Sequence, residues 1–110
     1  MKAFKITIFI ATLGLTTPAL AVTKTFTNPR IDGGYHLDWC LTWAENCGAP
    51  AARAFCRLKG YDGVTDYKKT NAARPVTKTI NGGQICTTGE NHPHCDGFEF
   101  IECIQSSLPT

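Results

Sequence analysis

The densest group of side chains that can do chemistry is His92-Pro93-His94-Cys95-Asp96. Two imidazoles and a carboxylate can hold a zinc or copper ion when a further group converges on them. The proline restricts how the two rings converge, and the composition of the segment is typical of a loop. We therefore expect a plain exposed loop with no metal and no cofactor, and His92 and His94 are the only metal-ligand candidates.

The three histidines also allow a ribonuclease-like site. His36 with His92 or His94 would supply the acid and the base, and Lys68 or Lys69 would hold a phosphate group. Imidazoles suit this work because they titrate near neutrality. Nothing in the sequence brings these side chains together, so a small secreted ribonuclease is an alternative hypothesis.

Carboxylates are numerous enough to include a glycosidase pair, which is the second enzymatic alternative. Asp38 is the carboxylate whose surroundings are most distinctive, because Trp39 follows it directly. Most carboxylates of a small domain are instead solvated or cap a turn. A serine nucleophile is excluded, because Ser106 and Ser107 are the only serines and lie in a polar tail.

Two sets of side chains are candidates for binding. Tyr35 and Trp39 can stack on a sugar ring or a partner side chain, although tryptophans such as Trp39 and Trp43 also build cores. Arg53 and Arg57 are one helical turn apart and can together hold a carboxylate, phosphate or sulfate group. The alternative for this pair is an ion pair with Asp or Glu within the fold.

The N-terminal segment is typical of an export signal. Two lysines in Met1–Lys5 precede an apolar stretch, Ile6–Leu15, and Ala19-Leu20-Ala21 supplies the small residues that signal peptidase reads. We expect residues 1–21 to be a cleaved signal peptide, which implies secretion or a periplasmic location without a membrane anchor. The remaining chain then has 110 − 21 = 89 residues.

Charge gives no indication of a nucleic-acid partner. Lys2 and Lys5 account for the formal net charge of +2, so the mature chain is neutral. Basic residues nevertheless gather in the middle of the chain, and the last third carries acidic residues alone. We expect these two faces to attract each other within the fold.

Six cysteines follow the signal, at positions 40, 47, 56, 86, 95 and 103. An exported chain meets an oxidising compartment, and an even count predicts complete pairing into disulfides. No short Cys-x2-Cys pair indicates zinc. Fifteen pairings are possible, and the spacing selects none of them.

The local patterns predict an α+β domain, with one helix packed on an antiparallel sheet. The helix is expected from Pro50 to Lys59, because proline suits its first turn and Gly60 its C-terminal cap. Residues 22–36 are expected to be an extension or an edge strand, residues 37–104 the disulfide-stapled domain, and residues 105–110 a tail. The other expected elements are a strand or helical turn over Tyr35–Trp43, a strand over Val64–Lys68, a hairpin of Val76–Ile80 and Gln84–Thr87, and a strand over Phe98–Ile104. In that last strand we expect Phe98, Phe100 and Ile104 on one face and Ile101 and Cys103 on the other.

The cysteines and their neighbours resemble a small secreted cysteine-rich domain known from plants and bacteria. The motif is Asp38-Trp39-Cys40-Leu41 … Cys47-Gly48-x-Pro50-Ala51-Ala52-x-x-Phe55-Cys56-Arg57-x-x-Gly60-Tyr61 … Gln84-Ile85-Cys86 … Cys95-x-Gly97-Phe98-x-x-Ile101-x-Cys103. It spans Leu37 to Cys103. The resemblance implies a scaffold and no established activity.

A fainter likeness is to scavenger-receptor cysteine-rich domains, through Ala52-x-x-x-Cys56-Arg57-x-x-Gly60. Those domains pair the helix cysteine with a C-terminal one, which implies a Cys56–Cys103 disulfide and a role in ligand binding. With it we choose Cys40–Cys47 and Cys86–Cys95, which close short local loops.

The sequence therefore favours an exported binding or interaction module for a protein or glycan ligand. A small secreted hydrolase is the alternative, and so is an enzyme inhibitor that presents the Thr87–His94 loop. The sequence leaves the oligomeric state open.

Overall fold

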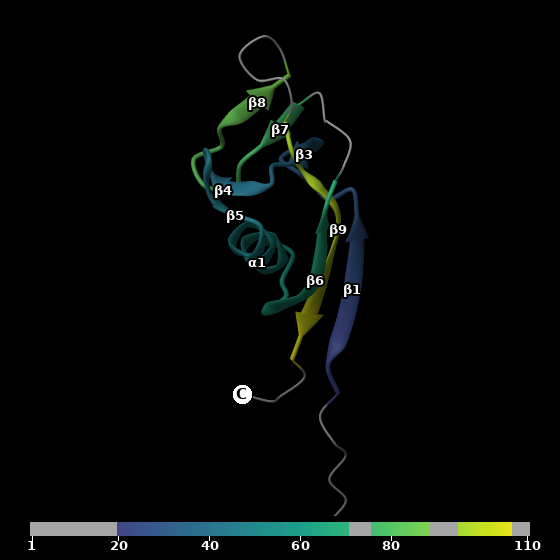
Figure 1. Cartoon of the computed structure of the whole chain (residues 1–110). Coiled ribbons are helices and arrows are strands. Elements are labelled where there is room, and N and C mark those ends of the chain that lie inside the picture. The colour runs from purple at the N-terminus through teal and green to yellow at the C-terminus, as the bar shows by residue number, and fades with distance from the viewer. Residues whose placement is uncertain (1–19, 71–75, 89–94, 107–110) are drawn as a thin grey trace, which may run out of the picture.

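The computed structural model describes residues 20–70, 76–88 and 95–106, and shows a small, strand-rich domain with one helix (Figure 1). The elements in chain order are β1 (Val22–Thr27), β2 (Arg30–Ile31), β3 (Tyr35–Leu37), β4 (Cys40–Thr42), β5 (Glu45–Cys47), α1 (Ala49–Leu58), β6 (Gly63–Lys69), β7 (Val76–Lys78), β8 (Ile85–Thr87) and β9 (Phe98–Gln105). Strand accounts for 54% of the described residues and helix for 13% of them, so the expected α+β class describes the domain only loosely.

The longest strands form an antiparallel sheet in the order β1-β9-β6. Helix α1 packs on β6 and β9 (Figure 1). The core lies between them, where Phe55 and Cys56 of α1 meet Ile101 and Cys103 of β9, all fully buried. Phe26 of β1 is partly buried and packs against this core, with its ring edge to face with that of Phe55.

The local sequence explains both ends of α1. Pro50 lies in the first turn, where a missing N–H costs nothing. At the other end Gly60 has a φ of 91°, its N–H donates to the Arg57 carbonyl, and the Tyr61 N–H donates to the Cys56 carbonyl. This is a Schellman cap, which needs a residue that tolerates positive φ. The expected helix is confirmed, one residue earlier than predicted at each end.

The strand over Phe98–Ile104 is confirmed as β9, but the predicted division of its faces is partly wrong. Phe98 is 2% exposed and lies in the core with Ile101. The register explains the difference: Lys68 pairs with Phe100 and Lys69 with Phe98, so β9 carries one extra residue at this point. A bulge of this kind re-aims the side chains that follow it, and strict alternation fails.

A second sheet, in the order β2-β3-β7-β8, lies beyond one end of the first. The β7–β8 hairpin around Asn81-Gly82-Gly83 is confirmed, with positive φ at Gly82 and Gly83. The β3–β7 pair is parallel, which the prediction of a purely antiparallel sheet did not include. The Tyr35–Trp43 segment forms strands β3 and β4, so its helical alternative is wrong.

Three disulfides join the domain, and the chosen pairing is confirmed. They are Cys40–Cys47, Cys56–Cys103 and Cys86–Cys95. Cys56–Cys103 ties α1 to β9 inside the core, and Cys40–Cys47 joins directly opposed residues of β4 and β5. The expected attraction between the charged faces is also present, as Lys68–Glu99 and Lys69–Asp96 ion pairs between β6 and the β9 region.

Candidate functional site

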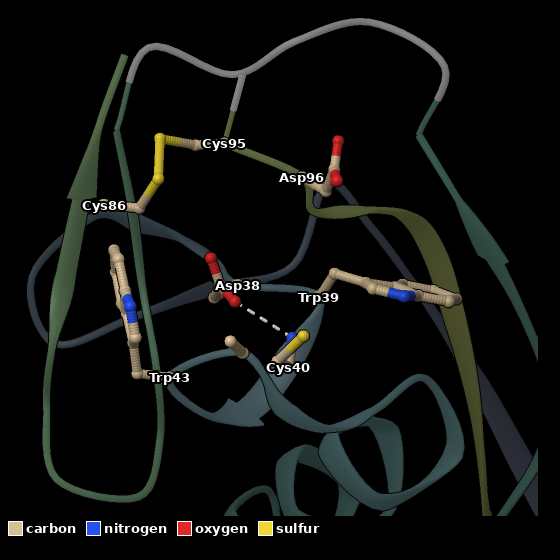
Figure 2. A pocket seen from close by; sticks show the side chains of 8 residues that line it. Asp38, Trp39, Cys40, Trp43, Cys86, Cys95 and Asp96 are labelled. Carbon is tan, nitrogen blue, oxygen red and sulfur yellow. Dashed lines mark hydrogen bonds between the residues drawn. A yellow bond between two sulfur atoms is a disulfide. The ribbon is translucent and has the colours of Figure 1, made fainter. Parts of the chain in front are cut away.

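A pocket of about 360 Å³ lies between the β4–β5 hairpin and the Cys86–Cys95 disulfide. Figure 2 shows the side chains around it. Its lining residues are Asp38, Trp39, Cys40, Trp43, Ala44, Cys86, Cys95 and Asp96. Two of the three disulfides thus contribute to its wall, through Cys40 of β4 and through Cys86 of β8 with Cys95.

Asp38 is fixed in the middle of this pocket by bonds to two strands. One carboxylate oxygen accepts a hydrogen bond from the Thr77 hydroxyl of β7 at 2.5 Å, and the other accepts one from the Cys40 N–H of β4 at 2.9 Å. Its own N–H donates to the Lys78 carbonyl at 3.0 Å. The Asp38 carboxylate is therefore held where the chain leaves β3 and enters β4, facing the pocket (Figure 2).

Trp43 lies across the pocket from Asp38 (Figure 2). It occupies the two-residue turn of the β4–β5 hairpin, and its backbone N–H donates to Oε1 of Gln84 at 3.0 Å. Asn81 fastens the same hairpin, through its N–H to the Leu41 carbonyl and its side-chain amide to the Thr42 hydroxyl, both at 3.0 Å. The β7–β8 turn therefore sets the position of the half-buried Trp43 indole.

Trp39 lines the pocket with its backbone side, while its ring points away (Figure 2). The ring packs on Phe98 with centroids 4.8 Å apart and on Tyr67 at 5.8 Å. Gly48 lies against the ring so closely that a Cβ there would be 3.3 Å from Cζ2. The Trp39 indole is thus part of the packing that supports the pocket.

Asp96 forms the rim of the pocket beside the Cys86–Cys95 disulfide. Its backbone carbonyl accepts a hydrogen bond from the backbone N–H of Trp39 at 2.8 Å, and its carboxylate lies 3.5 Å from Nζ of Lys69. That ammonium also lies 5.4 Å from the centre of the Trp39 ring. Asp96 and Trp39 therefore share one cation, which fixes the rim relative to the first sheet.

The arrangement offers two kinds of contact to a ligand. The Trp43 indole presents an apolar aromatic surface, which suits the C–H face of a ring. Asp38 and Asp96 present carboxylate oxygens, which accept hydrogen bonds only and can each accept more than one. Such a site suits a neutral, hydroxyl-bearing molecule with an apolar face.

The structure places the other predicted residues elsewhere. Arg53 and Arg57 lie on the exposed face of α1, outside the pocket lining, and none of the ion pairs among the described residues includes them. Tyr35 is 36% exposed and lines a separate cavity of about 470 Å³ with His36 and Arg30.

The loop predictions fall outside the described residues. His92 and His94, the metal-ligand candidates and the proposed partners of His36 in a ribonuclease, belong to residues 89–94, as does most of the Thr87–His94 inhibitor loop. In the part of the chain that the structure describes, no group of three His, Cys, Asp or Glu side chains is placed to hold a metal ion.

Two of the pocket residues have another role than the one expected from the sequence. Trp43 was interpreted chiefly as a core residue, and Asp96 only as a metal ligand. A tryptophan in the two-residue turn of a cysteine-bridged hairpin was the available signal for Trp43, because a turn keeps its side chain away from the core. Asp96 gave no such signal, since its place on the rim depends on the Trp39 and Lys69 contacts.

Comparisons with protein-family models, curated proteins and solved structures found no match to this chain. The resemblance to secreted cysteine-rich domains stays a prediction that rests on the motif alone. No helix in the described part of the chain is long and apolar enough to cross a membrane.

Proposed function

We propose that the protein is an exported binding module whose pocket holds one ring of a glycan. The observation that carries the proposal is the presence of the Trp43 indole with the Asp38 and Asp96 carboxylates in one pocket, between two disulfides. A pyranose ring has an apolar face for the indole and hydroxyl donors for the carboxylates.

The rigidity of the pocket supports binding. Residues that are already fixed lose little freedom when a ligand arrives, so more of the contact energy appears as affinity. Here the Cys40–Cys47 bridge fixes the hairpin that carries Trp43, and the Cys86–Cys95 bridge fixes the opposite wall. Export is part of the same proposal: residues 1–21 have the pattern of a signal peptide, and three disulfides suit an oxidising compartment.

A glycosidase is the second candidate, because Asp38 and Asp96 are two carboxylates on one pocket. We favour binding, since both oxygens of Asp38 already accept hydrogen bonds from the protein. These bonds hold the carboxylate in one position and serve a recognition site as they stand. A glycosidase would release reducing ends from the glycan that it binds, and a binding module would leave the glycan intact.

The test is a glycan array probed with the exported, oxidised protein. We expect a defined group of glycans to bind, and Trp43→Ala to weaken that binding at least about tenfold, the scale of one lost aromatic contact in a small site. The double variant Arg53→Ala/Arg57→Ala is the matched control, because both arginines lie outside the pocket. An array without binders, or binding that Trp43→Ala leaves unchanged, contradicts the proposal.

A further inference from the structure

The free edge of β1 is the second feature of the domain that suits a partner. In the described part of the chain, β1 lies at one edge of the β1-β9-β6 sheet, and its six residues pair with β9 without irregularity. The opposite edge strand, β6, has two irregularities in its register. Bulges protect a sheet edge from pairing with another strand, and β1 has no such protection.

The register shows which peptide groups lie on this edge. The Asn28 N–H donates to the Glu99 carbonyl at 2.9 Å, which directs the peptide groups of the even-numbered residues toward β9. Successive residues of a strand alternate, so the N–H and C=O groups of Thr23, Thr25 and Thr27 point to the open side. This edge therefore offers hydrogen-bonding groups from three alternate residues to an added strand.

A groove of about 530 Å³ runs beside the same strand. Residues 25–30 form one side, and Phe55 and Lys59 at the end of α1 form the other. Its aromatic floor is well packed: the Phe26 and Phe55 rings lie edge to face with centroids 5.2 Å apart. An extended segment along β1 would thus find backbone partners at the edge and side-chain room in the groove.

The charge of the groove indicates what kind of segment fits. Arg30 and Lys59 line it, and no Asp or Glu of the described ranges does. Lys24 and Lys59 hold their ammonium groups 5.0 Å and 5.5 Å from the Phe26 and Phe55 ring centres. Among the described residues, no ion pair includes any of these three cations.

We propose that β1 receives an extended acidic segment of a partner protein as an additional strand. Acidic side chains at alternate positions would face Lys24, Arg30 and Lys59 while the backbone pairs with the three threonines. A second copy of this chain fits less well, because its own β1 would bring the same three cations against them. This proposal is independent of the glycan pocket.

The test uses two synthetic eight-residue peptides, one alternating Thr with Glu and one alternating Thr with Lys. Amide hydrogen exchange is measured by NMR on the exported protein with each peptide. With the acidic peptide we expect exchange at Thr23, Thr25 and Thr27 to slow by at least about tenfold, while the amides of Lys24 and Phe26 keep their rates because they already bond to β9. The basic peptide should leave all five rates unchanged.

Two variants distinguish the contribution of backbone pairing at the edge of β1 from the contribution of charge in the groove. Thr25→Pro removes an outward N–H and the long side-chain bond to Glu102, but no backbone hydrogen bond to β9. An edge strand tolerates proline at such a position, so the variant should keep the sheet and abolish the slowing. Lys59→Glu should weaken the acidic peptide and leave the β1–β9 pairing intact. The proposal is overturned if the threonine amides exchange at unchanged rates, if both peptides act alike, or if the protein elutes as a dimer whose exchange is slow without peptide.

Discussion

Removal of the Cys56–Cys103 disulfide and removal of the Cys86–Cys95 disulfide should have different effects. Cys56–Cys103 closes a loop with a sequence separation of 47, and its cysteines are fully buried between α1 and β9. Cys86–Cys95 closes a loop with a sequence separation of 9 and lines the pocket. The first should therefore govern stability, and the second should govern binding.

Loop-closure entropy sets the magnitudes. For a separation of 47 the cross-link contributes about 4.0 kcal/mol to the free energy of unfolding, and for a separation of 9 about 2.6 kcal/mol. Both disulfides are buried, but only Cys56 and Cys103 belong to the main core cluster. Core packing lost there widens the gap of about 1.4 kcal/mol. With a urea dependence of about 1 kcal/mol per molar for so small a domain, the two denaturation midpoints should differ by more than about 1 M.

The assay compares two double variants, Cys56→Ala/Cys103→Ala and Cys86→Ala/Cys95→Ala, by urea unfolding and by binding to an array-selected glycan. We expect the second pair to keep the higher midpoint but lose most of its glycan affinity. The first pair should keep its affinity wherever it remains folded, which far-ultraviolet circular dichroism records. Equal midpoints, or a greater loss of affinity in the Cys56–Cys103 variant, would refute this division of roles.

Three further variants test the contacts of Gly48 and Asp38 that support the pocket and the role of the arginine pair outside it. Gly48→Ala should lower the free energy of unfolding by about 1–3 kcal/mol, because Gly48 has a φ of 77° and its Cβ would press on the Trp39 ring; urea unfolding followed by tryptophan fluorescence measures it. Asp38→Asn should lower the free energy of unfolding by about 1–3 kcal/mol, since a charged acceptor for two protein donors is lost. Calorimetry measures it, and an unchanged melting temperature would contradict a stabilising role of these hydrogen bonds. Arg53→Ala/Arg57→Ala should change stability by less than about 0.5 kcal/mol, with the relief of repulsion favouring the variant; a larger loss in urea unfolding would reveal a partner for these arginines within the fold.

The sequence predicted those elements whose signals are local. Pro50 and Gly60 bound α1, and Asn81-Gly82-Gly83 indicated the β7–β8 turn, because each depends on the backbone preference of the residue itself. The Cys56–Cys103 pairing was instead implied by a likeness to another domain, and the structure contains that disulfide. The local signals of the helix and the turn do not depend on which distant segments contact them.

The features that the sequence did not reveal depend on contacts between distant segments. The extra residue of β9 places Phe98 in the core, and only the pairing with Lys68 and Lys69 shows it. The parallel β3–β7 pair joins segments about forty residues apart, for example His36 with Thr77. No local turn motif in the sequence predicts a pairing over this distance. The pocket exists only because this pairing brings the Trp43 hairpin against Cys86, so its residues could not be grouped from spacing alone.

The most direct measurement of the central claim is an NMR titration that follows the indole N–H signals of the protein. The chain has two tryptophans, so two indole signals are expected: the Trp43 ring is part of the pocket, and the Trp39 ring packs on Phe98 outside it. On addition of an array-selected glycan we expect the Trp43 signal to shift most, the Trp39 signal to shift less because its ring packs on Phe98, and the glycan to remain uncleaved. A glycan that binds while both indole signals stay in place would contradict the assignment of the pocket as the binding site.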